Sequence, residues 1–186
     1  MTMCTSFYDY NELLDLGFCN VGSQVFISRK VSLYGVESMS IGNNVRIDDF
    51  CILSGEVVLG SNIHIGAYSA LYGSMGIKLE DNTGISPRCS LFSAMDDFGG
   101  DFLIGPIHAK ELTHVTGGPI LLKQYSQVGA GCIVFPNVTL EEGSVVGAMS
   151  LVNGSLPEWT VSVGVPARVI RKRSSNVKLV VDKERM

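Results

Sequence analysis

Aliphatic residues return at every sixth position along most of the chain, separated by polar residues, glycines and small side chains. A glycine or an acidic residue often follows the aliphatic one directly, and a small or β-branched residue stands four positions after it. The aliphatic series runs through Ile27, Leu33, Ile41, Ile47, Leu53, Leu59, Ile65, Leu71, Leu79, Ile85, Leu91, Leu122, Val128, Val134, Leu140, Val146 and Val152, with two-residue slips before Ile41 and Leu79. Such fixed-period self-similarity is typical of a solenoid built from one small unit.

A six-residue unit provides one short strand and one corner. The aliphatic side chain then points inward, the small residue fits where the corner turns inward, and a glycine permits the tight bend. Three units close a triangular coil, and stacked coils bury a continuous core. The pattern therefore predicts an all-β fold, a parallel β-helix. Cys51, Cys89 and Cys132 occupy the small inward position, which predicts packing rather than chemistry for their thiols.

The repeat also predicts how the chain is divided. We expect a cap at residues 1–20, one β-helix domain at 21–173 and a charged tail at 174–186. The segment YDYNELLDLGF predicts a short helix over the open end, because solenoids need a cap at each terminus. The repeat stops at 96–119, which predicts a long protruding loop, and loops of this length are usually functional or disordered.

The repeat resembles that of the hexapeptide-repeat acyltransferases, whose β-helix is left-handed. The segment GVPAR near the end of the repeat is similar to the acetyl-CoA end of that family, and AMDDFGG is similar to a subgroup that acetylates surface polysaccharides. The resemblance implies an acetyl-CoA-dependent acetyltransferase of the galactoside and maltose O-acetyltransferase type. The expected acceptor is a hydroxyl of a sugar or nucleotide-sugar in O-antigen or capsule (lipopolysaccharide) biosynthesis. N-acetylation of an amino sugar is the alternative.

The same resemblance implies a homotrimer with active sites between subunits, and it directs attention to His64, Asp96 and Asp97. Relatives of the galactoside type carry a catalytic histidine where this chain has Asp96. An imidazole, with an ordinary pKa near 6.5, suits general-base work better than a carboxylate near 4. We therefore expect His64, at an outward-facing corner, to be the base, with Asp96 or Asp97 orienting its ring across the subunit interface. Two alternatives stay open: Asp96 is itself the base, which an amine acceptor would favour, or the two acids only form a turn.

For the donor, the resemblance implies acetyl-CoA contacts at Ala130, Ala148, Arg168 and Arg171. Small side chains would let the thin pantetheine arm lie against the backbone of adjacent coils. Arg168, Arg171 and the two basic residues after it would supply charge to the phosphates of CoA. The competing interpretation is a solvated basic tail.

Composition removes several other classes of function. The net charge of −4 argues against nucleic acid as a partner, and no apolar run approaches the roughly 20 residues of a membrane span. The N-terminus does not resemble a signal peptide, and five cysteines without a CxxC pair suit reduced thiols, so we expect a cytoplasmic protein. Three histidines, at 64, 108 and 114, would permit a zinc site like that of the β-helix carbonic anhydrases. Their spacing does not match that family, and we expect no metal.

Overall fold

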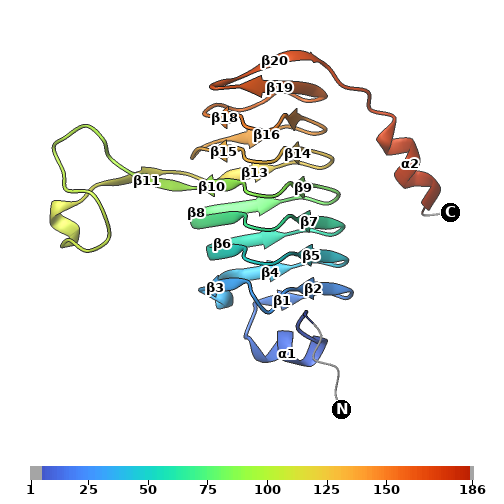
Figure 1. Ribbon diagram of the computed structural model, residues 1–186, viewed down its shortest axis with the longest axis horizontal. Coiled ribbons are helices and arrows are strands. Elements are labelled where there is room, and N and C mark those ends of the chain that lie inside the picture. The colour runs from blue at the N-terminus through green and yellow to red at the C-terminus, as the bar shows by residue number, and fades with distance from the viewer. Residues whose placement is uncertain (1–5, 185–186) are drawn as a thin grey trace.

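The computed structural model describes residues 6–184, with side chains to 181, and shows a triangular prism of short stacked strands (Figure 1). Face 1 is an eight-stranded sheet. It contains β2 (Val25–Ile27), β5 (Val45–Ile47), β7 (Ile63–Ile65), β9 (Gly84–Ile85), β14 (Gln127–Val128), β17 (Val145–Val146), β19 (Thr160–Gly164) and β20 (Ala167–Lys172). All its neighbours pair in parallel except β19 and β20, which form an antiparallel hairpin at the C-terminal end.

Faces 2 and 3 share one ten-stranded sheet, because β6 (Ile52–Leu59) and β8 (Ala70–Leu79) each continue around a corner. Face 2 also holds β3 (Ser32–Tyr34), β10 (Ser90–Phe92), β15 (Ile133–Val134) and β18 (Leu151–Val152). Face 3 also holds β1 (Asn20–Val21), β4 (Met39–Ile41), β13 (Ile120–Leu122) and β16 (Thr139–Leu140). A 3-10 turn, η1 (Val36–Ser38), leads into β4.

The interior of the prism confirms the six-residue pattern. Every member of the aliphatic series from Ile41 to Val152 is at most 2% exposed, and only Leu33, in the first coils, is half-buried. Alternation along each strand puts these side chains inside and their neighbours outside, so the stacked coils share one continuous core. The predicted fold class, a left-handed parallel β-helix, is confirmed.

The inward cysteines pack as predicted. Cys51, Cys89 and Cys132 are fully buried, and burial raises the pKa of Cys89 to about 11. A thiol with so high a pKa is a poor nucleophile near neutral pH. Cys19 is exposed, and Cys4 lies outside the described residues.

A short helix, α1 (Tyr10–Asp15), precedes the first coil. Asp9 and Glu12 form a reciprocal capping box at its start, in which each side chain accepts a hydrogen bond from the other's backbone N–H. Leu13, its buried residue, joins the prism core. The rest of the predicted cap, residues 1–5, lies outside the described part of the chain.

The break in the repeat is an arm that extends away from the prism (Figure 1). It begins as an antiparallel ribbon of β11 (Ala94–Asp96) and β12 (Val115–Gly117), and its tip carries the 3-10 turn η2 (Lys110–Leu112). The excursion thus starts two residues before the predicted loop, because β11 leaves the prism while still hydrogen-bonded as a strand. At its root, the Gly118 N–H donates to the Ser93 carbonyl at 2.8 Å.

The tail returns along face 1 as α2 (Val177–Glu184). Arg173 fixes its start: Nη1 donates to the carbonyls of Tyr125 (2.7 Å) and Gly143 (2.8 Å), and its backbone N–H donates to Trp159. Within residues 6–184, neither helix has the length and apolar character that crossing a membrane would need.

Candidate active site

An open groove of about 690 Å3 lies between the outer surface of face 1 and α2. Strands β5, β7, β9 and β14 form its floor, and Arg173 and α2 form one side. The residues that line it are Asn44, Arg46, Asn62, Ile63, His64, Asn82, Thr83, Gly84, Ile85, Ser86, Pro87, Tyr125, Gln127, Arg173, Val177 and Val181.

His64 lies on the flat of face 1 rather than at a corner, so the predicted corner position is wrong. It is the middle residue of β7, and the buried Ile63 and Ile65 on either side force its side chain outward. Its Nε2 lies 2.7 Å from Oδ2 of Asp48 in the preceding coil, while Arg46 Nε donates to Oδ1 of the same carboxylate at 2.7 Å. Asp48 therefore holds the ring in one orientation and leaves Nδ1 for other partners.

The electrostatics of Asp48 follow from these two contacts. Its partial burial works to raise its pKa, but the hydrogen bonds from His64 and Arg46 outweigh burial, and the pKa lies below its ordinary value. The carboxylate is therefore charged at neutral pH. Asp48 directly follows Ile47, the place in the repeat where a glycine or an acidic residue is common, so the sequence indicates only a structural corner for it. Laying the coils over one another would have revealed the contact, because Arg46 and His64 are in register.

Asp96 and Asp97 lie on the arm, away from His64 in the same chain. Asp96 Oδ1 accepts a hydrogen bond from the Gly105 N–H at 3.3 Å. Asp97 Oδ1 accepts from the Gly99 N–H at 2.8 Å, the local turn contact that was the competing interpretation of these acids. Any pairing with His64 needs a second chain, and it stays a prediction.

The other two histidines are also on the arm. The ring of His114 packs against that of Phe102, with 5.0 Å between centroids. Among the described residues, no group of three or more His, Cys, Asp or Glu is placed to hold a metal ion.

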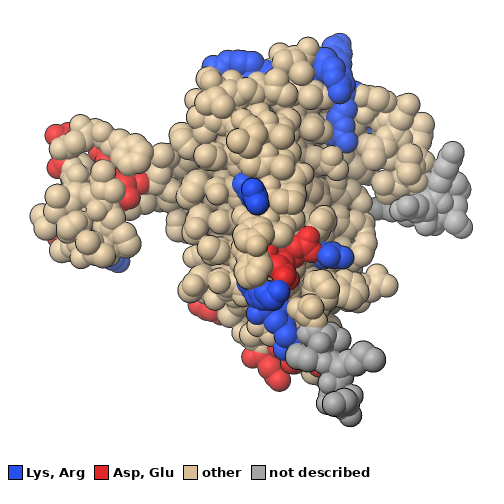
Figure 2. Space-filling model, viewed as in Figure 1, with Lys and Arg blue, Asp and Glu red and all other residues tan. Residues whose placement is uncertain are grey.

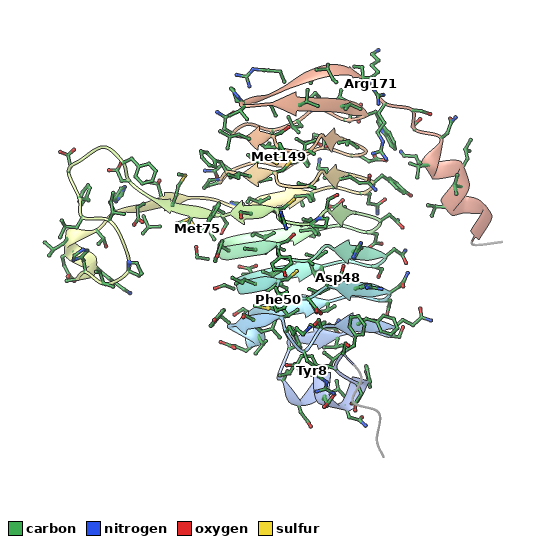
Figure 3. The ribbon with its side chains drawn as sticks, in the orientation of Figure 1. Tyr8, Asp48, Phe50, Met75, Met149 and Arg171 are labelled. Atoms are coloured by element: carbon green, nitrogen blue, oxygen red, sulfur yellow. The ribbon has the colours of Figure 1, made fainter. Side chains whose placement is uncertain are left out.

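The predicted donor residues lie toward the C-terminal end of the prism. Ala130 and Ala148 are exposed in consecutive coils at the corner between faces 1 and 2, where the Met149 N–H donates to the Ala130 carbonyl at 2.8 Å. Arg168 and Arg171 are exposed on β20, and Figure 2 shows basic side chains gathered at this end and acidic ones on the arm. Figure 3 shows Arg171 at the C-terminal end of the prism and Asp48, the partner of His64, in its N-terminal half. Arg173 was predicted to supply charge to the phosphates of CoA. In the structure its guanidinium instead donates to two backbone carbonyls and anchors the tail.

Comparison with known proteins identifies the family, although no family model matches the chain. The dTDP-4-amino-4,6-dideoxy-D-glucose acyltransferase of Escherichia coli is 38% identical over 175 residues, which cover 92% of this chain and 91% of that protein. The chain belongs to the hexapeptide-repeat acyltransferases. It is therefore an acyltransferase, as the sequence indicates. A galactoside O-acetyltransferase of Escherichia coli K12 is more distant, at 27% identity over 154 residues, 78% of this chain and 70% of that one.

Within this acyltransferase family, a solved structure is very similar. AntD, an N-acyltransferase from Bacillus cereus crystallised with dTDP and 3-hydroxybutyryl-CoA, is 47% identical, with a TM-score of 0.94 over 97% of this chain and 96% of AntD. A variant of AntD was crystallised with dTDP-4-amino-4,6-dideoxyglucose and coenzyme A. The AntD variants alter a serine and an aspartate ten residues further along that chain. Ser86, in the groove, and Asp96, on the arm, have the same spacing here.

Proposed function

We propose that this acyltransferase transfers the acetyl group of acetyl-CoA to the 4-amino group of dTDP-4-amino-4,6-dideoxyglucose. The observation that carries the proposal is the similarity to two proteins named for this amino sugar or crystallised with it. Each match covers more than 90% of both chains. The comparisons thus favour N-acylation, the alternative of the sequence prediction, over transfer to a sugar hydroxyl.

His64 is the general base of the proposed reaction. The amine nitrogen attacks the thioester carbonyl, a C–N bond forms, the C–S bond breaks, and one proton must leave the nitrogen. With Nε2 held by Asp48, Nδ1 of His64 can take that proton and pass it to the departing thiolate of CoA. The charge of Asp48 stabilises the imidazolium that forms in between.

Asp96 acts on the amine from a neighbouring chain. Ser86 directly follows β9, at the corner where face 1 ends. Asp96 lies on the arm, which leaves the prism at the next corner, where face 2 ends, so the two residues lie at different corners of one chain. A closed trimer can place the arm of one subunit against face 1 of the next. There Asp96 would accept hydrogen bonds from the sugar amine, and Asp97, held in its turn, would shape the wall of the pocket.

Acetyl-CoA lies along the exposed corner formed by Ala130 and Ala148. The two alanines leave the backbone of adjacent coils accessible to a thin chain. Arg168 and Arg171, at the end of this corner, bind the phosphates. The thioester then points down the prism toward Ser86 and His64.

The decisive experiment is a transfer assay with purified protein. We expect release of CoA thiol, and a product heavier by one acetyl group, with dTDP-4-amino-4,6-dideoxyglucose. 3-Hydroxybutyryl-CoA tests the acyl group, and a galactoside and a nucleotide-sugar without an amine test O-acetylation. Transfer to a hydroxyl acceptor with none to the amine would refute the proposal.

A further inference from the structure

The arm that carries Asp96 is joined to the prism through a short base, and beyond this base it stands clear of the prism of its own chain (Figure 1). Asp96 ends β11, three positions after Ser93, the last residue before the arm. At about 3.3 Å per residue the two lie about 10 Å apart, so a rotation of about 6° at the base would move Asp96 by about 1 Å. The placement of Asp96 therefore depends on how the base is held.

The outgoing strand of the arm is held by the side chain of Ser93, which is fully buried. Its Oγ accepts a hydrogen bond from the Met75 N–H at 2.8 Å and donates to the Tyr72 carbonyl at 2.9 Å. Both partners belong to β8, in the preceding coil. The same place in the two earlier coils holds Gly55 and Gly73. Among these three coils, a side-chain hydroxyl is thus present only in the one from which the arm leaves.

The returning strand of the arm is held from the following coil by Asn137. Its Nδ2 donates to the Gly117 carbonyl at 3.1 Å, and its backbone N–H donates to the Gly118 carbonyl at 3.3 Å. A Cβ at Gly118 would lie only 1.8 Å from Asn137 Oδ1, and neither glycine has a φ in the left-handed region. The two glycines therefore serve close approach to Asn137, which favours a fixed base over a flexible hinge.

We propose that Ser93 and Asn137 are positioning residues, which clamp the arm to the coils on either side and so fix where Asp96 meets the amine of the acceptor. The inference rests on the proposed function for the role of Asp96. The two residues touch no substrate in it and act through the direction of β11 and β12. A misplacement of about 1 Å can cost on the order of 100-fold in rate, so the loss of one clamping hydrogen bond is enough to be measured.

Two substitutions remove the clamp one side at a time. Ser93→Ala removes the hydroxyl. Asn137→Gly removes the amide and keeps the backbone, because the φ of 59° at this position is one that glycine adopts readily. The matched controls lie at the N-terminal end of the prism. Ser28→Ala changes another fully buried serine, whose hydroxyl donates to Asp49, and Gln24→Gly changes another residue with a left-handed φ, of 55°.

Steady-state kinetics separate positioning from a general loss of structure. We expect kcat/KM for the amino sugar to fall about 10- to 100-fold in Ser93→Ala and in Asn137→Gly. KM for acetyl-CoA should change by less than about twofold, because the donor end of the prism is untouched. Both controls should keep wild-type kinetics. Wild-type kinetics in Ser93→Ala and Asn137→Gly, or equal losses toward donor and acceptor, would overturn the inference.

Hydrogen exchange tests the clamp without catalysis. The Asp97 N–H donates to the His114 carbonyl inside the arm, and the Gly118 N–H donates to the Ser93 carbonyl at the base. We expect both amides to exchange at least about tenfold faster in Ser93→Ala than in the wild type, since a loosened base opens more often. Unchanged exchange would overturn the inference whatever the acceptor is.

The inference and the proposed function can fail separately. Transfer to a sugar hydroxyl and not to the amine would refute the proposed function alone. The acceptor and donor effects of the two clamp variants, measured with that hydroxyl acceptor, would then decide the inference in the same way.

Discussion

At the scale of single residues, the outward side chains of face 1 carry the proposed chemistry. The ring of His64 is held by Asp48 in the preceding coil, and that contact orients the ring toward the groove. Asp48 is a positioning residue, because it acts through the imidazole. This division of work can be measured, since residues that act as a unit have non-additive effects.

We expect His64→Ala to lower kcat roughly 10²–10⁴-fold, the usual range for loss of a general base, with little change in KM for acetyl-CoA. Asp48→Asn should lower kcat less, and it should add almost nothing in the His64→Ala background. Steady-state kinetics of the two single variants and the double variant give both values. A nearly wild-type His64→Ala beside an inactive Asp96→Asn would make Asp96 the base.

Asp48 should also make stability depend on pH. Its pKa is lowered in the folded chain, so it stabilises the fold above its unfolded pKa, near 4, and this contribution disappears as the pH falls through the folded value. We expect Asp48→Asn to reduce the free energy of unfolding at pH 7 by about 0.5–1 kcal/mol, since its partners are exposed. Urea denaturation at pH 7 and near pH 3 checks this, and an equal difference at both would contradict it.

These outward contacts show what the sequence could and could not predict. Inward residues repeat every six positions, so the core from Ile41 to Val152 could be predicted residue by residue. The contact between His64 and Asp48 depends on how separate coils stack. The anchoring of Arg173 depends on where the tail folds back. Aligning successive coils by the six-residue period would have placed His64 beside Arg46 and close to Asp48, whereas the fold-back of the tail leaves no periodic signal.

At the scale of the strand, the alternation of inward and outward residues decides stability. In β8, Leu79 is fully buried in the prism, and its neighbour Lys78 is exposed. We expect Leu79→Ala to lower the free energy of unfolding by about 2–5 kcal/mol, the cost of a cavity in a packed core. Lys78→Ala should change it by less than about 0.5 kcal/mol. Thermal unfolding of both variants measures the contrast, and similar losses in the two would contradict the inward assignment.

The hairpin of β19 and β20 is the element that we assign to the donor. Arg168→Ala and Arg171→Ala should raise KM for acetyl-CoA more than they lower kcat, because phosphates bind equally in the ground and transition states. Each lost charge-assisted bond should cost about 1.5–3 kcal/mol of binding. Initial-rate kinetics with varied acetyl-CoA provide the test. Unchanged KM values in both variants would indicate a solvated basic tail.

At the scale of the whole molecule, the proposed site requires more than one chain. We expect a homotrimer in light scattering. We also expect activity to return when the inactive His64→Ala and Asp96→Asn chains are co-expressed. A random mixture in a closed trimer would leave about one quarter of the sites with both residues intact. Mixtures of each variant with itself are the control. Absence of recovery in verified mixed trimers would place His64 and Asp96 in separate functions.

The root of the arm has a consequence for how this acyltransferase can change. The chain leaves the prism after Ser93 and returns at Gly118, and a single backbone hydrogen bond joins the two residues. The coils above and below stay in register across the gap, since β10 pairs with β15 and β13 with β8. At the root, a Cβ at Gly117 would lie 2.3 Å from the Ser93 carbonyl oxygen, so that position is closed to other residues. Beyond it, insertions and deletions leave the stacking of the solenoid untouched. The length of the arm can thus vary without changing the coils that carry it, and under the proposed function such variation would alter the acceptor side of the site before the donor side.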